Sequence, residues 1–205
     1  MTPKISIRGK YIFIVFMILL MMIPGYHGCQ WEENTKLYHL LKEKVEITID
    51  SKKLHFRGEY VFLNPAEKED YDLMTYKFPC IEGMGKVHDV HIWLYPGMKK
   101  GRKITYGWGD MCVIFPVNFP PRKQSLLIVS YEQDIKKKMG SCILMSAKKE
   151  EPPVEKLELY VRLPVSARLK YTTIPLREED AGEKGSFRMI RKNLKPESDL
   201  IFTWK

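Results

Sequence analysis

The sequence predicts an all-β protein, an antiparallel β-sandwich that is either immunoglobulin-like or made of two stacked lobes. Three observations predict this fold class. Short runs in which apolar and polar side chains alternate recur along the chain, about eleven in all. Residues that favour turns separate them roughly every 8–15 positions. Only residues 31–44 carry apolar side chains at helical spacing.

The first element is an apolar run, residues 11–23 (YIFIVFMILLMMI), preceded by three basic residues and followed by a Pro-Gly pair. This layout is typical of a secretory signal. A helix that spans a membrane needs about 20 residues, so a retained anchor is the alternative. We expect residues 1–28 to be a signal peptide or a lipoprotein-type leader. The protein would then be periplasmic, on the cell surface, or membrane-associated through its N-terminal segment.

If the chain is exported, its four cysteines enter a compartment in which lipidation and disulfide formation are possible. Cys29 follows Gly28, as the lipidated cysteine of a bacterial lipoprotein follows a small residue, although the two positions before Gly28 depart from that signal. Lipidation there would anchor the chain to a membrane. We expect Cys80 to form a disulfide with Cys112 or Cys142, and three buried thiols are the alternative. No zinc-type cysteine spacing occurs, so no metal site is predicted.

Residues 29–44 are predicted to be a linker with a short helix, because Leu37, Leu40 and Leu41 recur at helical spacing. The β-sandwich domain is expected over residues 45–205. It opens with a hairpin, VEITID followed by KLHFRGEYVF, in which the apolar residues alternate with polar ones. Gly58 interrupts the second strand, as a bulge or a close backbone approach would.

The remaining strands follow in order. Before residue 150 they are expected at 73–78, 86–95, 103–106, 111–115, 125–132 and 141–147. A Glu-Glu-Pro-Pro run then suggests a sub-boundary near residues 150–154, where two lobes would meet. Four more strands are expected at 157–163, 168–174, 187–190 and 200–204.

The formal charge is +9, or about +6 without the leader. A basic surface favours anionic partners such as acidic polysaccharide or lipid headgroups. Here the basic residues are scattered through turns, which is also typical of an ordinary solvated surface. No nucleic-acid-binding motif occurs, so we expect no nucleic-acid partner.

Catalytic motifs are missing from the sequence as well. His88 and His91 are three apart, which in a regular strand places them on opposite faces, so one metal would not contact both. Asp89 and His91 would share a face and could act as an acid–base pair in an exported hydrolase, although a hydrogen-bonded surface histidine is the usual explanation of such a pair. No nucleotide- or cofactor-binding motif occurs, and no cofactor is predicted.

The aromatic residues suggest a binding platform. His91, Trp93 and Tyr95 alternate on one face of a strand, and Tyr106 and Trp108 lie close by in the sequence. Exposed aromatic rings offer a large contact area with few torsions to order, which suits sugars and protein partners. The alternative is that Trp93 packs beneath a second sheet.

Residues 45–131 resemble the N-terminal β-sandwich that precedes the catalytic domain of M1-type metallopeptidases. The likeness lies in the hairpin VEITIDSKKLHFRGEYVF, a middle group of strands and a late LLIVSYE strand. In that family the sandwich supports a zinc domain that follows it. The resemblance therefore implies a sandwich, and it carries over no functional residue.

Together these observations predict an exported, non-catalytic β-sandwich domain of the cell envelope that serves in binding or assembly. Its partner would be an envelope protein or a polysaccharide. A carbohydrate-binding module that uses the exposed aromatics is one alternative. A hydrolase that acts on an envelope polymer is the other.

Overall fold

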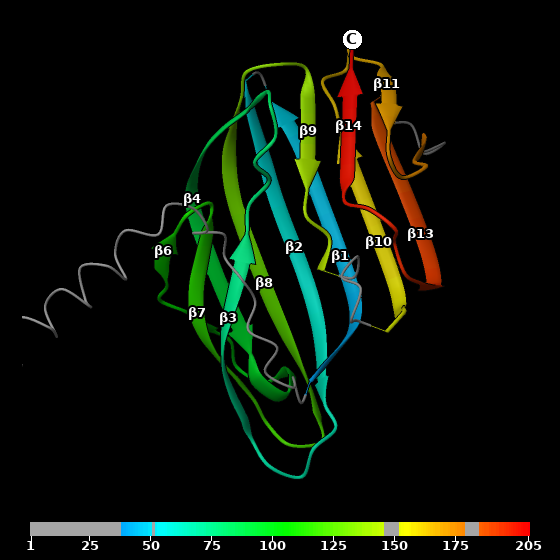
Figure 1. Ribbon diagram of the computed structural model, residues 1–205. Coiled ribbons are helices and arrows are strands. Elements are labelled where there is room, and N and C mark those ends of the chain that lie inside the picture. The colour runs from blue at the N-terminus through cyan, green and yellow to red at the C-terminus, as the bar shows by residue number, and fades with distance from the viewer. Residues whose placement is uncertain (1–37, 51, 146–151, 179–184) are drawn as a thin grey trace, which may run out of the picture. The chain divides into compact units, whose positions relative to one another are not determined.

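A computed structural model describes residues 38–50, 52–145, 152–178 and 185–205. The chain divides into two compact units, Met1–Gln30 and Trp31–Lys205, and all described residues belong to the second. The predicted leader and Cys29 therefore lie outside the described residues. The described part is all-β and forms three sheets (Figure 1).

The largest sheet has eight strands in the order β12-β13-β10-β1-β2-β8-β4-β5. In chain order these are β1 His39–Asp50, β2 Lys53–Asn64, β4 Met84–Tyr95, β5 Arg102–Lys103, β8 Lys123–Ile135, β10 Val154–Arg162, β12 Arg177–Glu178 and β13 Ser186–Leu194. All neighbours are antiparallel except β1 and β10, which run parallel. The expectation of a purely antiparallel arrangement is therefore wrong at this one pair.

Two three-stranded sheets complete the fold. One has the order β11-β14-β9 and the other β3-β7-β6. Their strands are β3 Asp70–Lys77, β6 Gly107–Gly109, β7 Cys112–Phe119, β9 Met139–Cys142, β11 Leu169–Thr172 and β14 Leu200–Trp204, and a 3₁₀ turn, η1, spans Pro96–Met98. Strands from all three sheets contribute to one hydrophobic core.

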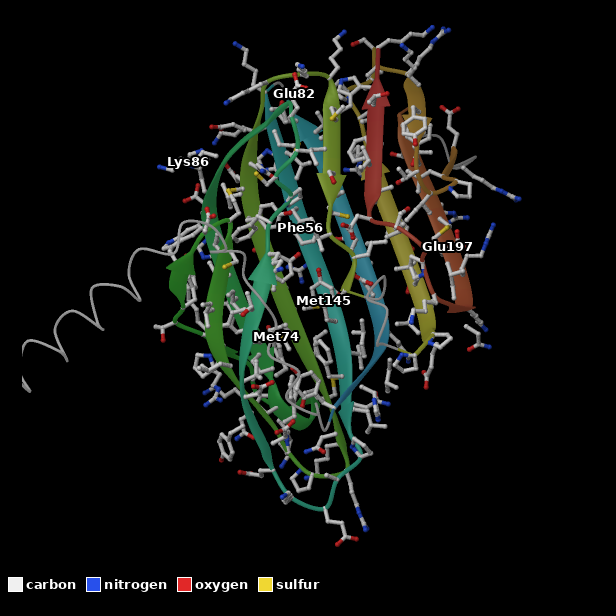
Figure 2. The ribbon with its side chains drawn as sticks, viewed as in Figure 1. Phe56, Met74, Glu82, Lys86, Met145 and Glu197 are labelled. Atoms are coloured by element: carbon white, nitrogen blue, oxygen red, sulfur yellow. The ribbon has the colours of Figure 1, made fainter. Side chains whose placement is uncertain are left out.

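The core lies against one face of the large sheet. Along β1 the side chains of Val45, Ile47 and Ile49 are buried, whereas those between them are half-buried. The same alternation marks β2 and β10. Phe56 of the large sheet and Met74 and Met145 of the opposite layer are all buried members of this core (Figure 2). One face of the large sheet is thus covered in a sandwich-like manner.

The helix predicted within residues 29–44 is wrong for the part that is described, because residues 39–44 belong to β1. A β-bulge at Leu41 explains the misleading pattern. Leu40 lies opposite Phe62 and Lys42 opposite Val61, so Leu41 is an extra residue that breaks the alternation. Pairing with β2 then outweighs the local helical spacing. The remainder of the predicted helix lies outside the described residues.

The parallel β1–β10 pair joins segments that are far apart in the sequence. Val45 lies opposite Leu159 and Ile47 opposite Val161. Strands that precede and follow residues 150–154 therefore share one sheet and one core.

Gly58 marks a close approach and not a bulge. Its register is continuous with Val45 on one side and Val129 on the other. A Cβ atom at this position would lie 2.4 Å from the hydroxyl oxygen of Tyr60, whose side chain is fully buried. The hydroxyls of Tyr60 and Tyr76 are hydrogen-bonded at 3.0 Å and tie the two layers together.

Asp199 directly precedes β14 and contacts the segment that follows β9 in the same small sheet. Its carboxylate accepts a hydrogen bond from the backbone N–H of Leu144 at 2.9 Å. Burial raises the pKa of Asp199 more than this hydrogen bond lowers it. The folded state therefore favours the protonated acid, and the group's contribution to stability is lost as the pH rises through its folded pKa.

We expect Asp199→Asn to be at least as stable as the wild type at pH 7, because the amide oxygen keeps the Leu144 contact without the half-buried charge. The difference should vanish near pH 3, below the ordinary value of 3.8, where Asp199 is itself neutral. Urea denaturation of both proteins at the two pH values measures this. A variant that is less stable only at pH 7 would contradict it.

Candidate functional site: the open face of the large sheet

The face of the large sheet that points away from the core carries ordered polar side chains. On β1, β2 and β10 these are half-buried or exposed, and neighbouring strands bring them into one continuous surface. We call this surface the open face and define it by Lys44, Glu46, Thr48, His55, Arg57, Glu59, His88, His91, Trp93, Tyr95, Ser130, Glu132, Glu158, Tyr160 and Arg162.

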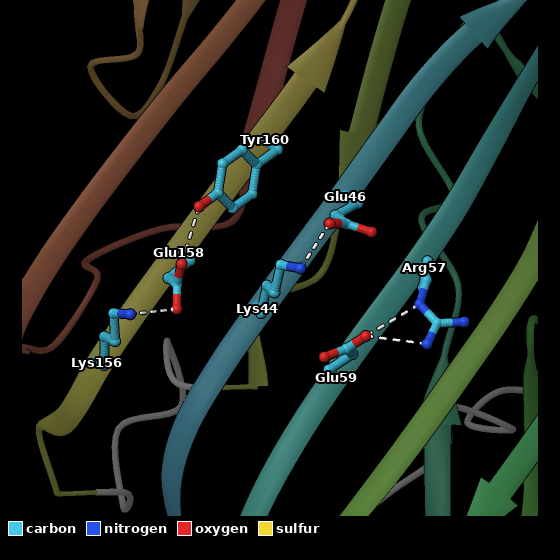
Figure 3. A network of polar contacts seen from close by, with 7 residues as sticks. All are labelled: Lys44, Glu46, Arg57, Glu59, Lys156, Glu158 and Tyr160. Atoms are coloured by element: carbon cyan, nitrogen blue, oxygen red, sulfur yellow. Dashed lines mark hydrogen bonds and ion pairs between the residues drawn. The ribbon is translucent and has the colours of Figure 1, made fainter.

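Ion pairs within each strand organise the centre of the open face (Figure 3). Lys44 contacts Glu46 at 2.7 Å. Arg57 donates two hydrogen bonds to Glu59, at 3.0 and 3.1 Å. Because residues two apart in a strand share a face, each pair lies along its own strand. Lys44 also lies opposite Glu59 across the β1–β2 ladder, so opposite charges face each other between strands as well.

On β10, Glu158 joins Lys156 and Tyr160. The Lys156 ammonium lies 2.7 Å from the Glu158 carboxylate, and the Tyr160 hydroxyl donates to it at 2.9 Å. Burial raises the pKa of Glu158, but these two hydrogen bonds and the nearby positive charges of Lys156 and Lys44 together outweigh it, so that the net pKa is lowered. Lys44 lies over the Tyr160 ring at 5.6 Å, which links β10 to β1. The charged side chains named here are therefore paired within a strand or with a neighbouring strand.

A second cluster lies where β2, β8 and β4 adjoin. His55 and His88 both stand opposite Glu132 in the register, one on each side. Glu132 contacts Lys53 at 2.5 Å and His55 at 3.3 Å, and His88 contacts Asp134 at 3.1 Å. The hydrogen bond from Lys53 lowers the pKa of Glu132. In the described parts of the chain, no three or more His, Cys, Asp or Glu residues are arranged to hold a metal ion.

The prediction that His88 and His91 lie on opposite faces is wrong. His88 lies opposite Glu132 and His91 opposite Ser130, so both point to the open face. The two intervening residues face a single residue of β8, and Asp89 has a positive φ of 48°. A bulge at this point shifts the alternation by one residue.

The predicted binding residues of β4 lie on the open face near its β5 edge. His91 is exposed, Tyr95 is half-buried, and Trp93 is 40% exposed, with Ile92 and Leu94 buried between them. Trp93 lies opposite Ile128 of β8 and Lys103 of β5. Trp93 therefore does not pack beneath a second sheet.

Tyr106 and Trp108 lie elsewhere. The Tyr106 hydroxyl donates to the Val90 carbonyl at 3.0 Å, and its ring centre is 5.8 Å from that of Trp108. Trp108 pairs with the buried Val113 and lies 5.9 Å from the ring of Phe78, so it points inward from the edge strand β6. It is still 58% exposed. The five aromatic and histidine residues that the sequence brings together therefore occupy two separate surfaces.

The sequence pattern alone does not indicate the Lys44–Tyr160–Glu158 network. Beside it a shallow depression of about 220 Å³ is lined by residues of β1, β10 and β13, including Glu46, Thr48, Tyr160 and Arg162. The strand patterns VEITID and LELYVRL indicate that these side chains face outward. They do not indicate that the two strands are neighbours, since that pairing is non-local.

The expected disulfide is not present in the described part of the chain: no bridge joins Cys80, Cys112 or Cys142. Cys112 lies on β7 and Cys142 on β9, in different small sheets, and Cys80 is exposed. Burial raises the pKa of Cys142 well above its ordinary value. A strand-like sequence around a cysteine does not show which sheet the strand joins, so the pairing could not be deduced.

Within the described ranges there is no helix that is both long enough and apolar enough to cross a membrane.

The fold defines a class: an all-β protein in which a large sheet buries one face against two small sheets and presents the other. No protein family model and no curated protein sequence matches the chain. A solved structure from Legionella pneumophila, described as a "putative nutrient binding protein", superposes with a TM-score of 0.63 at 13% identity. The match covers 82% of this chain and 67% of the other, and at this identity it shows the fold alone.

Solved M1-type peptidases also match. Yeast LTA4 hydrolase has a TM-score of 0.49 at 11% identity, over 87% of this chain and 31% of that protein. An M1 zinc metallopeptidase from Deinococcus radiodurans has a TM-score of 0.46 at 10% identity, over 81% of this chain and 42% of the other. The resemblance predicted from the sequence is thus confirmed as a weak structural likeness. The chain spans less than half the length of either peptidase.

Proposed function

We propose that the chain is a non-catalytic β-sandwich domain, exported to the cell envelope, that binds an envelope protein or polysaccharide through the open face. The observation that carries this proposal is the asymmetry of the eight-stranded sheet. One face is buried in the core, and the other presents an extended surface of paired charges with Trp93 at its margin. The fold is also that of a protein described as nutrient-binding, so it is compatible with a binding role.

Two further arguments support the proposal. The basic segment and the short apolar run at the N-terminus favour export. On the open face, each carboxylate of the central network already has a basic or hydroxyl partner on the same strand. Such paired groups favour recognition of a polar partner over proton transfer, which needs a group free to accept or release a proton.

Trp93→Ala tests the open face. We expect the variant to fold normally, because Trp93 is 40% exposed, and to bind isolated envelope fractions at least about tenfold more weakly, since aromatic anchors dominate interface energies. Co-sedimentation of the purified protein with graded amounts of envelope measures the affinity. Trp108→Ala is the matched control, because Trp108 lies on the opposite layer. Equal binding by Trp93→Ala and the wild type would contradict the proposal.

A carbohydrate-binding module is the second candidate, because Trp93 and Tyr95 both lie on the side of β4 that points away from the core, as a sugar platform requires. Repeating the measurement with purified, protein-free envelope polysaccharide separates the two candidates. The intact mass of protein purified from membranes would show whether the leader is cleaved and whether Cys29 carries lipid.

A further inference from the structure

The outer edge of β13 is the second surface of interest. β13 pairs with β10 from Ser186 to Leu194, but on its other side β12 pairs only with Phe187 and Arg188. Among the described residues, no strand pairs with this side from Met189 to Leu194. The half of β13 beyond β12 forms the margin of the large sheet (Figure 1). An unpaired strand edge presents N–H and C=O groups that can pair with another chain.

The exposure of the edge fits a docking surface. Ile190, Arg191, Lys192 and Asn193 are all exposed, although side chains on opposite faces of a strand normally alternate in burial. Both faces of this stretch are therefore open to a partner. From Met189 to Lys192 the strand is regular, spans roughly 13 Å and offers about two donors and two acceptors along the outer edge. At Asn193, which has a positive φ of 50°, the ladder with β10 is interrupted.

The basic side chains of β13 favour a partner strand that carries acidic side chains. β13 carries three basic side chains, Arg188, Arg191 and Lys192, and no acidic one. Arg188 and Lys192 face the open face, because they lie opposite Tyr160 and Lys156 of β10, and Arg191 faces the other side. A second copy of the chain paired along this edge would bring basic side chains against basic ones, which destabilises a strand pair. An acidic strand would be stabilised on both faces.

We propose that the edge of β13 from Met189 to Lys192 docks an extended, acidic segment of a partner protein by β-strand addition. The partner's backbone pairs with the edge, its acidic side chains contact Arg191 and Lys192, and an apolar residue covers Ile190. In the free protein the Arg191 guanidinium donates to the Ile190 carbonyl at 3.0 Å, so the incoming strand replaces this local contact. This surface is distinct from Trp93, so its test is independent of the function proposed above.

Fluorescence anisotropy of a labelled eight-residue peptide in which Glu-Glu and Val-Val pairs alternate tests the proposal, because each face of this peptide, when extended, carries both carboxylates and apolar side chains. We expect the full chain to bind this peptide, to bind it more weakly as salt increases, and to bind the matching Lys-Val peptide at least about tenfold more weakly. The double variant Arg191→Glu/Lys192→Glu should lose the acidic peptide and gain the basic one. Lys99→Glu/Lys100→Glu changes the charge equally at exposed positions between η1 and β5, far from β13 in the sheet order, and should bind as the wild type does.

A peptide with N-methyl groups on alternate backbone nitrogens separates strand addition from simple charge attraction. It keeps every carboxylate and loses the donors on one edge, so we expect the form methylated on the pairing edge not to bind. Equal binding of both methylated forms, equal loss in the Lys99/Lys100 control, or no binding to the wild type would overturn the proposal. Sedimentation that shows a dimer of the chain abolished by Ile190→Pro would instead identify a second copy as the occupant and also overturn it.

Discussion

Replacing Gly58 by valine is expected to destabilise the protein by about 3 kcal/mol, the upper end of the usual cost of overpacking a core. Gly58 lies in the middle of β2, between β1 and β8. A Cβ atom there would lie 2.4–2.6 Å from three atoms of the Tyr60 ring and hydroxyl. That ring cannot easily move aside, because it is fully buried and its hydroxyl is bonded to that of Tyr76.

Urea denaturation followed by far-UV circular dichroism measures the change in unfolding free energy. Gly107→Ala is the matched control, since no atom lies within 4 Å of the added Cβ at that position in β6. We expect the control to change stability by less than about 0.5 kcal/mol. A Gly58→Val protein as stable as this control would show that Tyr60 does not lie across the strand as described.

Leu159→Ala is expected to cost about 2–5 kcal/mol, the range for removing a large aliphatic side chain from a core. Leu159 has no exposed surface and lies opposite Val45 across the parallel β1–β10 ladder. The segment that follows residues 150–154 is thus part of the same core as the N-terminal hairpin. The loss should therefore shift a single cooperative transition to lower denaturant concentration.

Tryptophan fluorescence and far-UV circular dichroism, recorded on the same samples, test that cooperativity. Coincident transitions are expected for both proteins, at a lower urea concentration in the variant. Glu155→Ala, an exposed position on the same strand, should leave the midpoint almost unchanged. Two separate transitions, of which Leu159→Ala shifts only one, would indicate independently folding lobes.

Much of the β structure was predictable from the sequence. The alternation in VEITID and KLHFRGEYVF predicts two strands whose apolar faces are buried, and β1 and β2 bury those residues. The period of two along β4 predicts that Ile92 and Leu94 share one face and Trp93 lies on the other, and in the structure the first two are buried and Trp93 is exposed. These predictions succeed because the direction of a side chain depends on the local backbone alone.

The predictions from the sequence failed where a strand contains a bulge or where the outcome depends on contacts between distant segments. Bulges at Leu41 and near Asp89 each shift the alternation by one residue. The first bulge explains the wrong prediction of a helix at residues 39–44. The second explains the wrong prediction that His88 and His91 lie on opposite faces. Trp108 is close to Trp93 in the sequence but belongs to a different sheet. A period of two cannot show that a residue has been inserted or which sheet a strand joins.

By itself the sequence determined that this chain is all-β, which residues face a core, and that its N-terminus has the composition of an export signal. The tertiary structure alone decided that β10 runs parallel to β1 and that the open face gathers Lys44, Tyr160 and Glu158. It also decided that, among the described residues, no strand pairs with the outer edge of β13 beyond Arg188. The physical reason is that side-chain alternation follows from the geometry of a single strand. The choice of neighbours depends on hydrogen bonds and packing between segments more than a hundred residues apart.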